Sequence, residues 1–189
     1  MKNMETLQRS FGTVGNEKYE LDPQKLDEHT KMVMRCRERA LFLIEASEKT
    51  ERRLREKLGK ANRYPEDVIE DTIQFLKQYG YLDDEQLAAR YVEAYAASRS
   101  VREIRQKLFQ KGFSEQVIKN SLSVYCEKHD SGQAEQEAAE KLIRKKIGSR
   151  GITDEATKKK LYAFLVRKGF SYDQAAKALK ISEGEMGSV

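Results

Sequence analysis

The sequence predicts an all-α protein of three tandem three-helix units, each of helix-turn-helix type, arranged as an elongated, curved array. The tetrapeptide Lys-Gly-Phe-Ser stands at 111–114 and returns at 168–171, and the flanking apolar residues agree at the same shift of 57 positions. A more diverged copy lies about 50 residues upstream. A fixed period near fifty residues indicates an array built from one supersecondary unit.

The repeated apolar positions predict the core. Ile104 and Leu108 fall on Leu161 and Leu165, and they are preceded at a distance of 50 positions by Leu54 and Leu58. We therefore expect Leu58, Leu108 and Leu165 in equivalent buried places. As in other repeat proteins, each unit should bury its apolar face mainly on its neighbours.

The chain divides into five segments on this pattern. Residues 1–21 lack clear periodicity and are expected to form an irregular arm. The first unit covers 22–82 and has an extended first helix, which Asp22 followed by Pro23 would begin. The second unit covers 83–129, the third covers 130–181, and a tail follows at 182–189.

Helix starts and stops recur at matching places in the units. Gly112 and Gly169 follow the last periodic residues of a helix, where a left-handed glycine can end it. The next residue, Phe113 or Phe170, can then fold back on the layer below. Side chains with the spacing or chemistry of N-caps begin the following helices: Thr50, Asp84, Ser100 with Glu103, Ser114, and Ser171 with Gln174.

Composition limits the classes of protein that are possible. Of 189 residues 35% are charged and 39% hydrophobic, which suits thin helical layers. No apolar run approaches the roughly twenty residues of a bilayer span, and the first residues lack the apolar core of a secretory signal. Cys36 and Cys126 lie far apart without CxxC spacing. We expect a cytoplasmic protein with no membrane partner.

No catalytic constellation is present in the sequence. The phosphate-binding GK[ST] loop, HExxH, GxSxG and metal-spaced cysteines are all missing. The pair Asp83 and Asp84 could hold Mg²⁺ as in a nuclease, but two carboxylates at a helix start are more typical of a cap. The sequence predicts a protein that is not an enzyme and that has no cofactor and no metal.

Basic residues recur once per unit on the second helix. Under the shifts that align the cores, Arg52, Arg102 and Lys159 are equivalent. A second row three residues on contains Arg55, Arg105 and, in the third unit, Tyr162. A basic stripe with this period suits a long, periodic, acidic partner. An ordinary solvated helix face is the alternative that the residues leave open.

Two denser basic patches lie in the third unit. One contains Lys141, Arg144, Lys145, Lys146 and Arg150, and the other contains Lys158, Lys159, Lys160, Arg167 and Lys168. Such local fields attract phosphate backbones or acidic protein surfaces without sequence information of their own. Four tyrosines could stack on bases: Tyr79, Tyr81, Tyr91 and Tyr95. Their spacing is more typical of core residues. The candidate contact residues are Arg52, Arg55, Arg102, Arg105, Lys111, Arg144, Lys145, Lys146, Lys158, Lys159, Arg167 and Lys168.

Four blocks of the sequence read KTERRLREKL at 49–58, GYLDDEQLA at 80–88, REIRQKLFQKGFS at 102–114 and RKGFSYDQAAKAL at 167–179. Together they resemble the RecX family, the regulators of the RecA recombinase. The resemblance covers roughly residues 37–180 and implies tandem three-helix units that lodge in the groove of the RecA filament on DNA. It also implies inhibition of filament growth, ATP hydrolysis and strand exchange, in recombination, DNA repair and the SOS response.

Two classes of function therefore compete. The first is a regulator that binds the RecA nucleoprotein filament, with single- or double-stranded DNA as a further partner bound without sequence specificity. The second is a free-standing helix-turn-helix DNA-binding protein. Three tandem units with recurrent charge suit a helical polymer better than a single major groove, so the sequence favours the first. We expect the chain to act as a monomer.

Overall fold

The computed structural model describes residues 27–148, 152 and 154–184. Within these residues it contains nine α-helices, one short 3₁₀ turn and no strand. The all-α prediction is confirmed. The predicted helix start at Asp22 and Pro23 lies outside the described residues, and the first described helix begins after Asp27, whose carboxylate accepts the Thr30 N–H at 2.9 Å.

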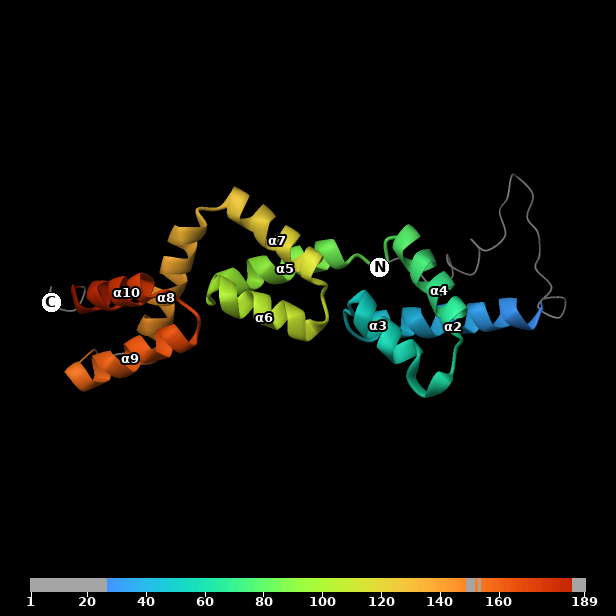
Figure 1. Cartoon of the computed structure of the whole chain (residues 1–189), viewed down its shortest axis with the longest axis horizontal. Coiled ribbons are helices and arrows are strands. Elements are labelled where there is room, and N and C mark those ends of the chain that lie inside the picture. Colours follow the sequence, from blue (N-terminus) through green and yellow to red (C-terminus); the bar gives the residue numbers. More distant parts are fainter. Residues whose placement is uncertain (1–26, 149–151, 153, 185–189) are drawn as a thin grey trace.

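The helices form three groups of three that follow one another along the longest axis (Figure 1). The first group contains α2 (Glu28–Ala46), α3 (Glu51–Leu58) and α4 (Glu66–Gln78), with the 3₁₀ turn at Lys60–Asn62. The second contains α5 (Asp84–Ala96), α6 (Val101–Lys111) and α7 (Glu115–Lys128). The third contains α8 (Ser131–Ile147), α9 (Glu155–Arg167) and α10 (Tyr172–Gly184). The tandem three-helix array is confirmed.

The repeated leucines occupy the predicted buried places. Leu58, Leu108 and Leu165 are 1%, 0% and 0% exposed, and each lies on the second helix of its group. Each belongs to a separate cluster of buried apolar side chains. The repeat in the sequence is therefore a repeat of cores.

The location of the cores differs from the prediction. The buried clusters run over residues 33–82, 87–122 and 138–179, so each lies inside one group of helices. The expectation that each unit buries its apolar face mainly on its neighbours is wrong. The three helices of a unit are long enough to bury their apolar faces against one another. The contacts between neighbouring units are therefore left to polar groups.

The N-caps follow the prediction at four places. The hydroxyls of Thr50, Ser100 and Ser114 accept backbone N–H groups at the starts of α3, α6 and α7. Ser171 and Gln174 form the reciprocal capping box before α10. These hydrogen bonds satisfy N–H groups that a helix leaves without partners at its first turn.

The predicted cap at Asp84 is wrong by one residue. Asp83 has extended backbone and its carboxylate accepts the Gln86 N–H at 2.9 Å, so it caps α5. Asp84 is already the first residue of α5 and turns toward another helix, where it accepts the Glu51 N–H at 3.0 Å. Asp84 thus caps the start of α3 in the preceding unit.

That contact is part of a polar joint between the first and second units, which we call joint 1. Besides the bond to Asp84, Thr50 Oγ1 donates to the Lys111 carbonyl at 3.1 Å. Joint 2 connects the second and third units in the same way. There Ser100 Oγ donates to the Lys168 carbonyl at 2.6 Å, and the first N–H of α6 donates to a Glu135 carboxylate oxygen at 2.8 Å.

The joints give the Lys-Gly-Phe-Ser repeat a second purpose. Gly112 and Gly169 have φ of +96° and +92°, which confirms the left-handed turn. A Cβ at Gly112 would lie 3.0 Å from Thr50 Oγ1, and one at Gly169 would lie 2.7 Å from Ser100 Oγ. Each glycine therefore both ends a helix and lets the turn press against the N-terminus of the second helix in the preceding unit.

Candidate functional site

The second helices of the units, α3, α6 and α9, lie along one side of the molecule, the lower side in Figure 1. The first row of the predicted stripe is exposed on all three: Arg52 on α3, Arg102 on α6 and Lys159 on α9. The structure thus brings the recurrent cations of the stripe to helices that share one side of the array.

In the first unit both arginines of the predicted stripe, Arg52 and Arg55, form ion pairs within the unit. Arg55 is half-buried and lies 2.9 Å from a Glu51 oxygen and 2.7 Å from a Glu70 oxygen. Burial would lower its pKa, but the bonds to Glu70 and Glu51 outweigh this and raise the pKa. Arg52 is exposed and pairs with Glu56 at 3.1 Å. Arg55 therefore holds α3 to α4, and Arg52 is the more available of the two.

The second unit carries two exposed cations of the predicted stripe. Arg102 and Arg105 are both exposed on α6. Neither forms an ion pair with another residue in the part of the chain that the structure describes. Two unpaired guanidinium groups three residues apart on one helix face can each take a bidentate contact with a carboxylate or phosphate.

Lys111 and Lys168, from the two Lys-Gly-Phe-Ser copies, are engaged at or near the joints. Lys111 Nζ lies 4.3 Å from the centroid of the Tyr91 ring. Lys168 Nζ lies 3.3 Å from a Glu103 carboxylate oxygen, and its carbonyl accepts the Ser100 hydroxyl. Both lysines are half-buried, so their intrachain contacts limit how far they are available to a partner.

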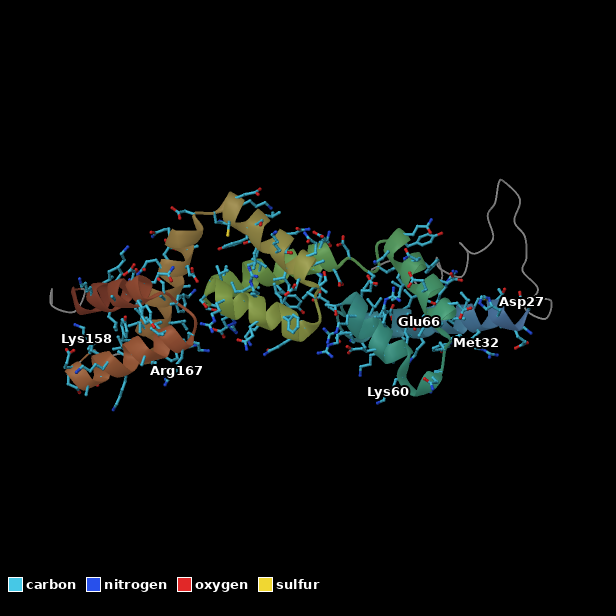
Figure 2. All side chains as sticks on the ribbon, viewed as in Figure 1. Asp27, Met32, Lys60, Glu66, Lys158 and Arg167 are labelled. Atoms are coloured by element: carbon cyan, nitrogen blue, oxygen red, sulfur yellow. The ribbon has the colours of Figure 1, made fainter. Side chains whose placement is uncertain are left out.

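The predicted patches of the third unit lie on α8 and α9. Arg144 is 3.9 Å from a Glu140 oxygen, and Lys146 Nζ is 4.2 Å from the centroid of the Phe164 ring. Figure 2 labels Lys158 and Arg167, which stand near opposite ends of α9. The exposed members of the patches are Lys141, Arg144, Lys145, Lys146, Lys159, Lys160 and Arg167; Lys158 is half-buried, and Arg150 lies outside the described residues.

The aromatic residues divide into packed and exposed groups. Tyr91 and Tyr95 are half-buried against the second core, as expected for core tyrosines. The same expectation is wrong for Tyr79, which is 53% exposed and lies against Phe75 with ring centroids 4.6 Å apart. Sequence reasoning also overlooked Phe109, which is 55% exposed on α6. The sequence could have revealed it, because Phe109 is an aromatic residue that does not share the helical spacing of the core residues Ile104 and Leu108.

The carboxylates of Asp83 and Asp84 both cap helices. Both side chains accept backbone N–H groups at helix starts, as described for the caps and for joint 1. In the described ranges no three His, Cys, Asp or Glu side chains come together as a metal site would require. Among the same residues, no helix combines the length and apolar character of a bilayer span.

Comparison with known proteins identifies the family of this chain. Residues 36–76 match the family model for the first three-helix domain of RecX, and residues 133–179 match that for its third. The regulatory protein RecX of Mycolicibacterium vanbaalenii is 30% identical over 158 residues, which cover 82% of this chain and 85% of that protein. The chain belongs to the RecX family.

Other relatives agree with this assignment. The regulatory protein RecX of Clostridium botulinum is 39% identical over 144 residues, 75% of this chain. The chain spans 65% of the length of that protein. The crystal structure of RecX from Lactobacillus salivarius superposes with a TM-score of 0.67 at 21% identity, covering 82% of this chain and 98% of that one. The RecX fold is thus shared over most of the array.

Proposed function

We propose that this chain binds the RecA nucleoprotein filament in the cytoplasm and inhibits its assembly, ATP hydrolysis and strand exchange, without catalysing a reaction itself. Membership of a family of regulatory proteins supports the proposal. The observation that carries it is a pair of exposed cations on α6, Arg102 and Arg105, which form no ion pair among the described residues. They lie at the middle of the array, and the other second helices, α3 and α9, run along the same side and also carry exposed cations.

The geometry suits an extended partner. A helical filament presents the same surface at regular intervals, and an array of similar units can contact several of them at once. The polar joints support this use because they connect neighbouring units through directed hydrogen bonds. Exposed cations mainly steer the encounter with an acidic partner and lie at the solvated rim of the interface. Salt screens such charges, so the affinity for the filament should fall as salt rises.

The test compares two double charge reversals in the second unit. One variant carries Arg102→Glu and Arg105→Glu on α6. The control carries Lys119→Glu and Lys128→Glu, which change the charge equally at exposed positions of α7. Figure 1 places α7 on the opposite side of this unit from α6.

The measurement is the rate of ATP hydrolysis by RecA on single-stranded DNA as each protein is added. We expect the parent and the α7 variant to inhibit alike and the α6 variant to inhibit weakly, because repulsion replaces attraction. Helix content and melting temperature should stay near those of the parent in both variants. Equal inhibition by all three proteins across a range of salt would show that the stripe is only a solvated face.

DNA is the further partner in this proposal, bound through phosphates and so without sequence specificity. The competing function, a free-standing helix-turn-helix protein, predicts sequence-dependent binding to bare duplex DNA. Titration of this chain into duplexes of scrambled sequence separates the two. Equal affinities across sequences would support the filament regulator, and strong preference for one duplex would support the alternative.

A further inference from the structure

The outer face of α6 presents an aromatic side chain beside the two unpaired cations. Phe109 lies four residues after Arg105 and seven after Arg102, which places all three on one helix face. The ring of Phe109 is 55% exposed. Core packing does not account for it, because Leu108 and Phe113 fill the core at this end of the helix.

The repeat does not account for Phe109 either. The shifts that align the cores place Gly59 and Val166 at the equivalent positions of the first and third units. The cations of the stripe recur in every unit, whereas this aromatic occurs only in the second. Phe109 is therefore a local addition to a repeated basic surface.

This face is continuous with both neighbouring units. At joint 1 a guanidinium nitrogen of Arg53 donates to the Gln110 carbonyl at 2.9 Å, which brings a cation of the first unit beside the residue that follows Phe109. At joint 2 a Cβ at Gly169 would lie 3.2 Å from Arg102 Cδ, so the turn after α9 packs against the other end of the face. The surface of α6 thus lies at the centre of the array.

We propose that Phe109 is the apolar anchor of the interaction surface, inserting into a recess on an acidic protein surface while Arg102 and Arg105 contact carboxylates around that recess. An exposed aromatic flanked by arginines has the composition of protein-interface hot spots. The inference rests on the proposed function, in which the protein surface is that of the RecA filament. It adds a residue and a kind of contact that the basic stripe does not contain.

A protein surface fits this face better than single-stranded nucleic acid. Proteins that track a nucleic acid strand stack successive bases on successive aromatic side chains. Here the equivalent positions are Gly59 and Val166, and the nearby tyrosines are occupied within the chain. Lys111 Nζ covers the ring of Tyr91, and the guanidinium of Arg99 lies 4.9 Å from the centroid of Tyr95.

The test removes one exposed phenyl ring at a time. Phe109→Ala removes the proposed anchor. Phe42→Ala is the matched control because Phe42 is 59% exposed on α2 and has a guanidinium, that of Arg39, 5.2 Å from its ring centroid. The dissociation constant is measured for RecA filaments on single-stranded DNA and for the same DNA without RecA, each at low and at high salt.

We expect Phe109→Ala to weaken filament binding about tenfold or more, as hot-spot truncations do. The loss should persist at high salt because an apolar contact is not screened. Phe42→Ala should stay within about twofold of the parent, as surface changes away from a contact usually do. Both variants should keep the melting temperature of the parent, since both rings are exposed.

Three results would overturn the inference. Equal filament affinity for Phe109→Ala and the parent would remove the anchor and leave the proposed function intact. An equal loss of affinity for DNA without RecA would make Phe109 a base-stacking residue instead. A parent that does not bind the filament at all would refute the proposed function, and the inference with it.

Discussion

Replacing Gly169 with alanine tests whether the turn glycines join neighbouring units or only end helices. Gly80 provides the matched control. It also follows a helix with positive φ, +69°, but a Cβ there would meet no atom within 4 Å apart from those of Gly80 and its neighbours in the chain. Gly80→Ala therefore adds only the strain of a left-handed alanine, whereas Gly169→Ala adds the same strain and a collision inside joint 2.

The two costs can be worked out from the contacts. A left-handed conformation costs a non-glycine residue roughly 1–2 kcal/mol, which applies to both variants. At Gly169 the new Cβ would lie 2.7 Å from Ser100 Oγ, so the hydroxyl must move. Ser100 would then lose the cap bond from the Glu103 N–H and its own bond to the Lys168 carbonyl, at roughly 1 kcal/mol each. We expect about 3–4 kcal/mol for Gly169→Ala against about 1–2 kcal/mol for Gly80→Ala.

Urea unfolding followed by far-ultraviolet circular dichroism measures the two free energies. Gly112→Ala should fall between the other two, because its Cβ would lie 3.0 Å from Thr50 Oγ1 and needs a smaller shift. If all three variants lost the same stability, the glycines would serve only to end helices and the joints would contribute nothing measurable to stability.

Two further predictions concern the cores and joint 1. Truncation of any one of the repeated leucines to alanine should cost roughly 2–5 kcal/mol in unfolding free energy, with similar values in the three units; an unaffected unit would contradict the equivalence of Leu58, Leu108 and Leu165. Burial raises the pKa of Asp84, so its protonated form is favoured in the folded state and its contribution to stability is lost as pH rises through the folded pKa. Asp84→Asn keeps an acceptor for the Glu51 N–H without the charge. It should therefore be at least as stable as the parent near pH 7, whereas Asp84→Ala should cost roughly 1 kcal/mol. Unfolding at several pH values between about 4 and 7 checks this, and equal loss in both variants would contradict it.

The sequence predicted what depends on local pattern. Apolar spacing on one helix identified Leu58, Leu108 and Leu165 as core, and the position of Gly112 and Gly169 after a helix identified their left-handed turns. These features follow from neighbours within a few residues. The tandem three-helix array followed from their repetition.

The features that the sequence did not predict depend on contacts between distant residues. Ser100 and Lys168 meet although they are 68 residues apart, and Asp84 turns from its own helix to cap α3. The period alone also could not show that each unit encloses its own core. At the candidate site, the sequence predicted Arg55 and Arg102 equally as contact residues because both are arginines on the stripe. The structure distinguishes them, since Arg55 forms ion pairs with Glu51 and Glu70.

Co-sedimentation tests the central claim most directly. The parent chain is mixed with RecA filaments on single-stranded DNA, with the same DNA alone and with RecA alone, and the pellets are compared at physiological salt. The account predicts that the chain sediments with the filament to a defined stoichiometry, well above the amount carried by DNA alone. A chain that stays in the supernatant with filaments, or that sediments equally with DNA alone, would contradict it.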